Sequence, residues 1–98
     1  MKIPKNIHFC GFDYKVALTD RLDGGDSWGR TDTHALTIDI EKNMPAQKQE
    51  QTFIHELLHV AFRHTQGWEK IATEDEEKLI KAWAMNIYGI LKDNKLLK

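Results

Sequence analysis

Two histidines and a glutamate lie close together in the run His55-Glu56-Leu57-Leu58-His59. Residues four apart on an α-helix lie on one face, so these two imidazoles can reach a single metal ion. Zinc binds histidine nitrogen at about 2.0 to 2.1 Å and, in catalytic sites, keeps one position for water. The spacing therefore predicts that His55 and His59 are two ligands of a zinc ion.

Glu56 follows His55 directly, which turns its side chain about 100° around a helix and places it beside the metal-binding face. A water bound to the metal would lie there, and a carboxylate in that position can act as a general base. Zinc lowers the pKa of its water toward about 7, so Glu56 can take the proton and hydroxide can attack a peptide carbonyl. The predicted chemistry is hydrolysis of a peptide bond.

A catalytic zinc site needs a third protein ligand. His64 comes five residues after His59 and lies about 140° around the helix, so we expect it to point away from the metal as a surface or packing residue. Glu76 and Glu77 both border the core face of the next predicted helix. A capping box between Thr73 and Glu76 would occupy Glu76. Glu77 is therefore the predicted third ligand, with Glu76 as the alternative.

Two helices must position these side chains. Asn43 and Pro45 before the motif and Gly67 after it predict a helix over residues 45–65. The second helix is expected to begin at Thr73 and to end near residue 94. Its apolar residues recur at three- and four-residue steps and predict one core-facing side, formed by Ile80, Trp83, Ala84, Ile87, Ile90 and Leu91.

The sequence before the first helix is prone to form β structure. Short stretches at residues 6–12 and 13–19 predict a hairpin, with Cys10 as a small buried residue in a strand. The glycines and aspartates of residues 20–32 predict a solvated loop. Apolar and polar residues alternate over residues 34–41, which predicts a strand at or near the edge of a sheet.

Together these elements predict one α+β domain over residues 1–98, with a small three-stranded sheet packed on the motif helix and the C-terminal helix. A net charge of -1 with scattered basic residues argues against nucleic acid as a partner. Apolar runs are too short for a membrane span. The N-terminus has no signal-peptide pattern, so we expect a cytoplasmic protein. The oligomeric state is left open.

The motif and its surroundings resemble the gluzincin branch of the zincin metallopeptidases. More narrowly, TFIHELLHVAF, the preceding TIDIE and the following EEKLIKAWAMNIYGILKDN are similar to small metallopeptidase-like proteins of phages and prophages. These are distantly akin to the ImmA/IrrE type. The resemblance covers residues 35–94, and a phage origin would place the protein in the cytoplasm of the host cell.

The resemblance implies that Glu56 is the catalytic acid and base and that one zinc ion has three ligands, His55, His59 and Glu77. It also implies a minimal zincin-like fold. In that fold residues 34–41 form the edge strand, which binds an extended peptide substrate by β-augmentation.

The sequence thus predicts a zinc-dependent metalloendopeptidase that acts on an extended segment of a protein. The alternative is a non-catalytic, zinc-stabilised protein-interaction module of phage origin. A third hypothesis is a metal-free helix whose histidines only pack. Cleavage of a peptide separates the first from the second, and bound zinc separates the second from the third.

Overall fold

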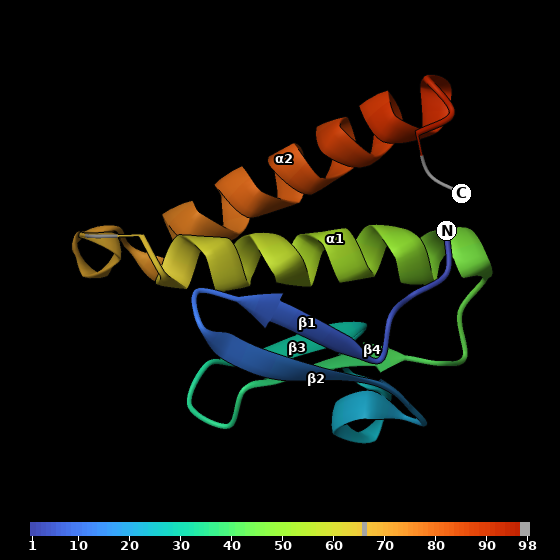
Figure 1. Ribbon diagram of the computed structural model, residues 1–98, viewed down its shortest axis with the longest axis horizontal. Helices are drawn as coiled ribbons and strands as arrows, with labels where there is room; N and C mark the ends of the chain where they lie inside the picture. Colours follow the sequence, from blue (N-terminus) through green and yellow to red (C-terminus); the bar gives the residue numbers. More distant parts are fainter. Residues whose placement is uncertain (66, 97–98) are drawn as a thin grey trace.

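The computed structural model describes residues 1–65 and 67–96. Within these ranges the chain has an α+β architecture of three layers, a four-stranded sheet and two helices (Figure 1). Helix α1 (Ala46–Arg63) covers one face of the sheet, and α2 (Thr73–Asp93) packs on the opposite side of α1. Helix α1, which carries the histidine motif, is therefore the central element of the fold.

The sheet has the strand order β1-β2-β4-β3. Strands β1 (Asn6–Phe9) and β2 (Phe12–Thr19) form an antiparallel pair, which confirms the predicted hairpin. Strand β4 (Thr37–Glu41) runs parallel to β2, and β3 (Gly29–Asp32) runs antiparallel to β4. The sheet is therefore mixed, with β1 and β3 at its two edges.

The prediction of three strands is wrong, because β3 lies in the segment that was expected to be a loop. Residues 20–32 contain a short 3-10 helix at Leu22–Gly25 and then β3. The sequence of β3, Gly-Arg-Thr-Asp, has little intrinsic strand preference. Its extended conformation comes from antiparallel pairing with β4 across a connection of four residues, a hairpin that these polar residues do not signal.

Residues 34–41 lie near the sheet edge, as the alternation predicts, but they do not form the edge strand that the resemblance implies. Strand β4 starts at Thr37 and has β2 on one side and β3 on the other, so both of its hydrogen-bonding edges are occupied. The apolar and polar residues that alternate in this segment lie on the two opposite faces of β4. Ile38 and Ile40 are fully buried against α1, whereas Asp39 lies on the opposite, partly exposed face. The edge strand that packs on α1, the helix of the motif, is β3.

The hydrophobic core lies between the sheet and α1. Its buried residues come from β2, β4 and α1: Tyr14, Ile38, Ile40, Phe53 and Val60. Cys10 does not belong to this core, contrary to the prediction. It is exposed in the turn between β1 and β2, where Cys10 and Gly11 have φ values of 53° and 80°. Two positive φ angles are what a tight hairpin turn requires, and this places Cys10 outside both strands.

Both helices confirm their predicted extents to within two residues. The predicted capping box of α2 is wrong, because Thr73 is the first helical residue and the N-cap is Ala72. The Glu76 amide donates a hydrogen bond to the Ala72 carbonyl at 3.0 Å, and the Glu76 carboxylate turns toward α1. Among the described residues, none of the helices is long and apolar enough to cross a membrane.

The predicted core face of α2 is correct only in part. Ile80 and Ala84 are buried, but Trp83 and Ile90 are 47% and 60% exposed. Within the described residues, α1 is the one element against which α2 packs extensively. The two helices diverge toward the C-terminal end of α2 (Figure 1). A helix with one neighbour buries a narrow stripe, so the rest of its apolar side remains at the surface.

Candidate metal centre

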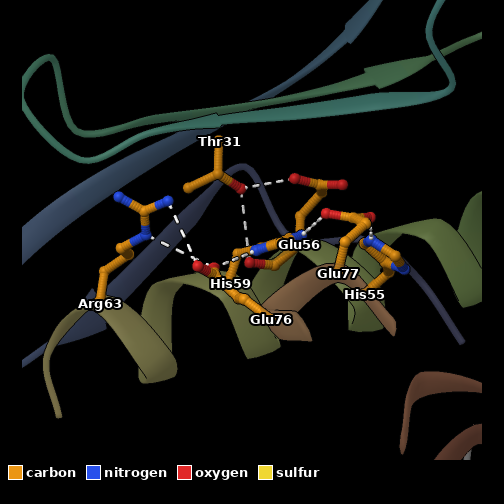
Figure 2. A network of polar contacts seen from close by, with 7 residues as sticks. All are labelled: Thr31, His55, Glu56, His59, Arg63, Glu76 and Glu77. Carbon is orange, nitrogen blue, oxygen red and sulfur yellow. Dashed lines mark hydrogen bonds and ion pairs between the residues drawn. The ribbon is translucent and has the colours of Figure 1, made fainter. Parts of the chain in front are cut away.

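The three predicted zinc ligands lie together where α1 meets the first turns of α2. Glu77 Oε1 is 2.9 Å from His55 Nε2, and Glu77 Oε2 is 3.1 Å from His59 Nε2 (Figure 2). One ligand atom from each of the three residues falls within 4.8 Å of the other two. The packing of α2 on α1 thus brings a carboxylate to both imidazoles.

This donor set fits a zinc ion. Two imidazole nitrogens and one carboxylate oxygen are common zinc ligands, and they leave one tetrahedral position for water or substrate. With bonds of about 2.0 to 2.1 Å, tetrahedral ligand atoms are about 3.3 Å apart. Glu77 places Oε1 2.9 Å from His55 Nε2 and Oε2 3.1 Å from His59 Nε2, so each imidazole has one oxygen of this carboxylate within a few tenths of an ångström of that separation.

The Glu76 carboxylate contacts His59 and does not cap the N-terminus of α2. Its carboxylate is 2% exposed and Oε2 accepts a hydrogen bond from His59 Nδ1 at 2.8 Å (Figure 2). This contact fixes the orientation of the ring and leaves Nε2 on the side of Glu77. The capping argument against Glu76 was therefore wrong, yet the geometry still places Glu77 and not Glu76 between the two histidines.

Glu56 is buried between α1 and β3. Its Oε1 accepts a hydrogen bond of 2.7 Å from the Thr31 hydroxyl, so the edge strand holds one of its two carboxylate oxygens. Burial raises the pKa of Glu56 above the ordinary glutamate value, against the opposing effects of the Thr31 hydrogen bond and the nearby histidines. A raised pKa brings a carboxylate closer to the range in which it exchanges protons at neutral pH.

A hollow of about 220 Å³ opens beside these residues, between β3 and the C-terminal half of α1. Its lining is polar and consists of Thr31, Thr33, Glu56, His59 and Arg63. A larger hollow of about 540 Å³ lies near the N-terminus of α1 and contains none of the predicted site residues. The smaller one is the relevant cavity, because it gives access to Glu56 and His59.

His64 is not part of the centre, as its position on the helix predicted. Its Nε2 is 3.1 Å from the Tyr14 hydroxyl, and its ring packs against the rings of Phe9 and Phe12. These contacts confirm a packing role and connect the end of α1 to the β1-β2 hairpin.

Sequence reasoning missed two residues of this site, Thr31 and Arg63. Thr31 could not be found because β3 itself was not predicted. Arg63 carried a usable signal, since it comes four residues after His59 and therefore extends the same face of α1 by one turn.

Comparisons of the chain with protein-family models, with curated proteins and with solved structures gave no match. The zincin resemblance therefore rests on the motif and on the chemistry of the residues around it.

Proposed function

We propose that this protein is a zinc-dependent metallopeptidase-like hydrolase. The observation that carries the proposal is the meeting of His55, His59 and Glu77 across two helices, with Glu56 buried beside them. Three carboxylates, Glu56, Glu76 and Glu77, lie around the two histidines, and a bound cation would offset their negative charge. A zinc ion would supply that cation.

In this proposal His55 Nε2, His59 Nε2 and one oxygen of Glu77 hold the zinc ion. When bound, zinc supplies Lewis acidity that makes water nucleophilic near neutral pH. His59 faces a carboxylate from each of its ring nitrogens, at 2.8 Å from Glu76 and 3.1 Å from Glu77. Zinc bound at Nε2 would leave Nδ1 to donate to Glu76, so Glu76 would orient the ring toward the metal.

Glu56 is the general base of the proposed reaction. Thr31 holds Oε1, which leaves Oε2 to take the proton from the attacking water. The same oxygen then returns the proton to the amine that leaves when the peptide bond breaks. The raised pKa of Glu56 makes its carboxylate a stronger base for the first step.

The proposed substrate is a protein segment in extended conformation. The strand at residues 34–41 cannot bind it, because β4 is internal. Strand β3 is at the sheet edge, and Thr31 connects it directly to Glu56. We therefore place the substrate along β3, where backbone pairing would present a peptide bond to the metal centre.

The test is the metal content of the purified protein together with cleavage of a peptide library by wild type and Glu56→Gln. We expect one zinc per chain in both proteins and cleavage by wild type alone. A reduction of kcat by at least 100-fold in Glu56→Gln is the expected size for loss of a general base. His64→Gln is the matched control, because it alters a histidine of the same helix outside the centre.

Three results would separate the alternatives. Cleavage that is unaffected by Glu56→Gln contradicts the mechanism. Stoichiometric zinc without cleavage of any peptide favours the zinc-stabilised interaction module. Failure to bind zinc at all leaves the histidines as packing residues.

A further inference from the structure

Arg63 is the only positively charged residue in the lining of the 220 Å³ hollow beside the proposed metal centre. It comes one helical turn after His59 on α1, so its side chain emerges on the same face as the motif. The remaining lining residues are two threonines, Glu56 and His59. The lining of the hollow therefore offers hydrogen-bond donors from Arg63 and Thr33, whereas the neighbouring centre is rich in carboxylates.

The guanidinium of Arg63 is held in place by two neighbours. Its Nε and Nη2 lie 3.4 and 3.3 Å from the two carboxylate oxygens of Glu76, which is almost fully buried (Figure 2). Its Cζ lies 4.2 Å from the centre of the Trp68 ring. An arginine fixed in this way loses little further side-chain entropy when it binds a ligand.

Arg63 keeps donors available for that ligand. A guanidinium has five N–H groups; Nε donates one to Glu76 Oε2, and Nη2 faces Glu76 Oε1 at 3.3 Å in an ion pair. The other three have no hydrogen-bond acceptor within residues 1–65 and 67–96. A planar set of N–H donors is the group that proteins use most for carboxylates.

Arg63 does not face the proposed ligand atom of His59 directly. Glu76 and the imidazole ring of His59 lie between the guanidinium and the Nε2 atom that faces Glu77 (Figure 2). Each residue of an extended peptide spans about 3.3 Å. A substrate paired with β3 would therefore present Arg63 with a group one or two residues away from the bond that is cleaved.

We propose that Arg63 and Thr33 of the hollow form a subsite for a carboxylate of the substrate. This inference rests on the proposed function and assigns its substrate class, a peptide with an anionic group close to the scissile bond. The carboxylate can be the C-terminus of the peptide or an Asp or Glu side chain. Glu76 is the positioning residue that holds Arg63 in place.

The experiment measures affinity rather than turnover. Peptide hydroxamates bind zinc through the hydroxamate group, so the remainder of the probe can report on the hollow. The first matched pair is hydroxamate-Leu-Gly with a free carboxylate or with a carboxamide at its C-terminus. The second pair carries Glu or Gln at the last position and a carboxamide terminus in both members. Calorimetry with zinc-loaded wild type gives the affinity ratio within each pair and distinguishes the two sources of the carboxylate.

We expect wild type to favour the carboxylate member of one pair by about 10- to 100-fold, the range for hydrogen bonds to a charged group. In Arg63→Gln this preference should fall to less than about 2-fold, with affinity for the uncharged member unchanged. A merely structural role for Arg63 would weaken both members equally. Lys81→Gln removes a positive charge from the exposed side of α2 and should leave the ratio unaltered.

Removal of Arg63 alone leaves the Glu76 carboxylate buried beside His59, which can unfold the site. The double variant Arg63→Met/Glu76→Gln removes both charges, while the glutamine oxygen still accepts from His59. It should show the same loss of preference. Equal affinity of wild type for the members of both pairs overturns the subsite. Absence of zinc or of any hydroxamate binding in wild type instead overturns the proposed function, and the subsite with it.

Discussion

Glu76 and Glu77 are adjacent in the sequence, yet their side chains have different surroundings. The Glu76 side chain is 2% exposed between His59 and Arg63, whereas the Glu77 side chain is 53% exposed and faces His55 and His59. One residue corresponds to about 100° around a helix. That rotation points Glu77 toward the proposed metal position, whereas Glu76 contacts Nδ1 of His59 and orients its ring.

The first prediction concerns the zinc affinity of variants at these two positions. Glu77→Gln removes the anionic ligand of the proposed site, so we expect it to lower zinc affinity more than Glu76→Gln does. For Glu76→Gln we expect a loss of about 10- to 100-fold, the usual effect of changing a partner of a metal-bound histidine. Competition with a chromophoric zinc chelator measures both, with the exposed Glu69→Gln as control. Equal zinc affinity in wild type and Glu77→Gln would contradict the ligand assignment.

At the scale of elements, the close approach of β3 and α1 positions the proposed general base. Gly29 of β3 faces α1, and a Cβ atom at this position would lie 2.7 Å from Thr52 Cγ2 and 2.9 Å from Glu56 Oε2. Two residues later the Thr31 hydroxyl donates to Glu56. The edge strand therefore approaches the helix closely enough to contact Glu56 because position 29 has no side chain.

The second prediction is that Gly29→Ala displaces α1 or Glu56 and destabilises the protein by about 1 to 3 kcal/mol, as overpacking does. Gly89→Ala is the matched control, because no atom lies within 4 Å of the Cβ position at Gly89 of α2. This control should stabilise the protein by about 0.5 to 1 kcal/mol through helix propensity. Urea unfolding measures both free energies. A neutral Gly29→Ala would show that the strand and helix are not in tight contact.

Glu41, at the end of β4, organises the segment that leads into β3. Its carboxylate accepts hydrogen bonds from the backbone amides of Leu22 at 2.7 Å and Asn43 at 3.1 Å. These two bonds hold the pKa of Glu41 below its ordinary value, although burial acts in the opposite direction. The ionised form of Glu41 therefore fixes the 3-10 turn at Leu22–Gly25 before the chain enters the edge strand.

The third prediction is a pH dependence of stability that comes from Glu41. A carboxyl with a lowered folded-state pKa stabilises the protein above its unfolded pKa of about 4.3, and the effect is lost as the pH falls through the folded-state value. Glu41→Gln should therefore have a lower free energy of unfolding than wild type at pH 7. The difference should shrink at pH values below about 4. Urea unfolding at several pH values measures it, and the exposed Glu69→Gln controls for the lost charge. A difference that does not change with pH would contradict this account.

At the scale of the whole molecule, the proposed zinc ion would link the two helices. Histidines of α1 and Glu77 of α2 approach each other near the start of α2, and the helices diverge beyond that point (Figure 1). Helix α2 also leaves large apolar side chains such as Trp83 and Ile90 exposed, so its attachment to α1 has a narrow apolar contact. A metal that binds both helices would contribute much of the free energy that holds α2 in place.

The fourth prediction follows from this link. Zinc at 100 times its dissociation constant stabilises the folded state by about 2.7 kcal/mol, since the unfolded chain has no formed site. For a domain of this length that corresponds to an increase in Tm of about 10 to 20 °C. Differential scanning calorimetry with zinc and with a chelator measures the shift, and Glu77→Ala should lose it. An identical Tm under both conditions would exclude a structural metal.

Features that depend on nearby residues were predicted better than the contacts of α2 with the rest of the molecule. Both helices, the hairpin and the grouping of His55 with His59 followed from spacing along the chain, because hydrogen bonds within a helix or a tight hairpin connect nearby residues. The capping box failed because Glu76 makes a tertiary contact with His59 instead of a local one. The buried face of α2 was overestimated because periodicity shows which residues are apolar and not how many neighbours a helix has.

The sequence by itself determined which face of α1 carries the proposed site, since 3.6 residues per turn place His55, His59 and Arg63 in line. Only the tertiary structure decided what meets that face. The crossing of α2 over α1 brings Glu77 to the two histidines, and the pairing of β3 with β4 brings Thr31 to Glu56. Contacts of this kind join residues 22 and 25 positions apart, and they depend on how the layers pack rather than on any local pattern.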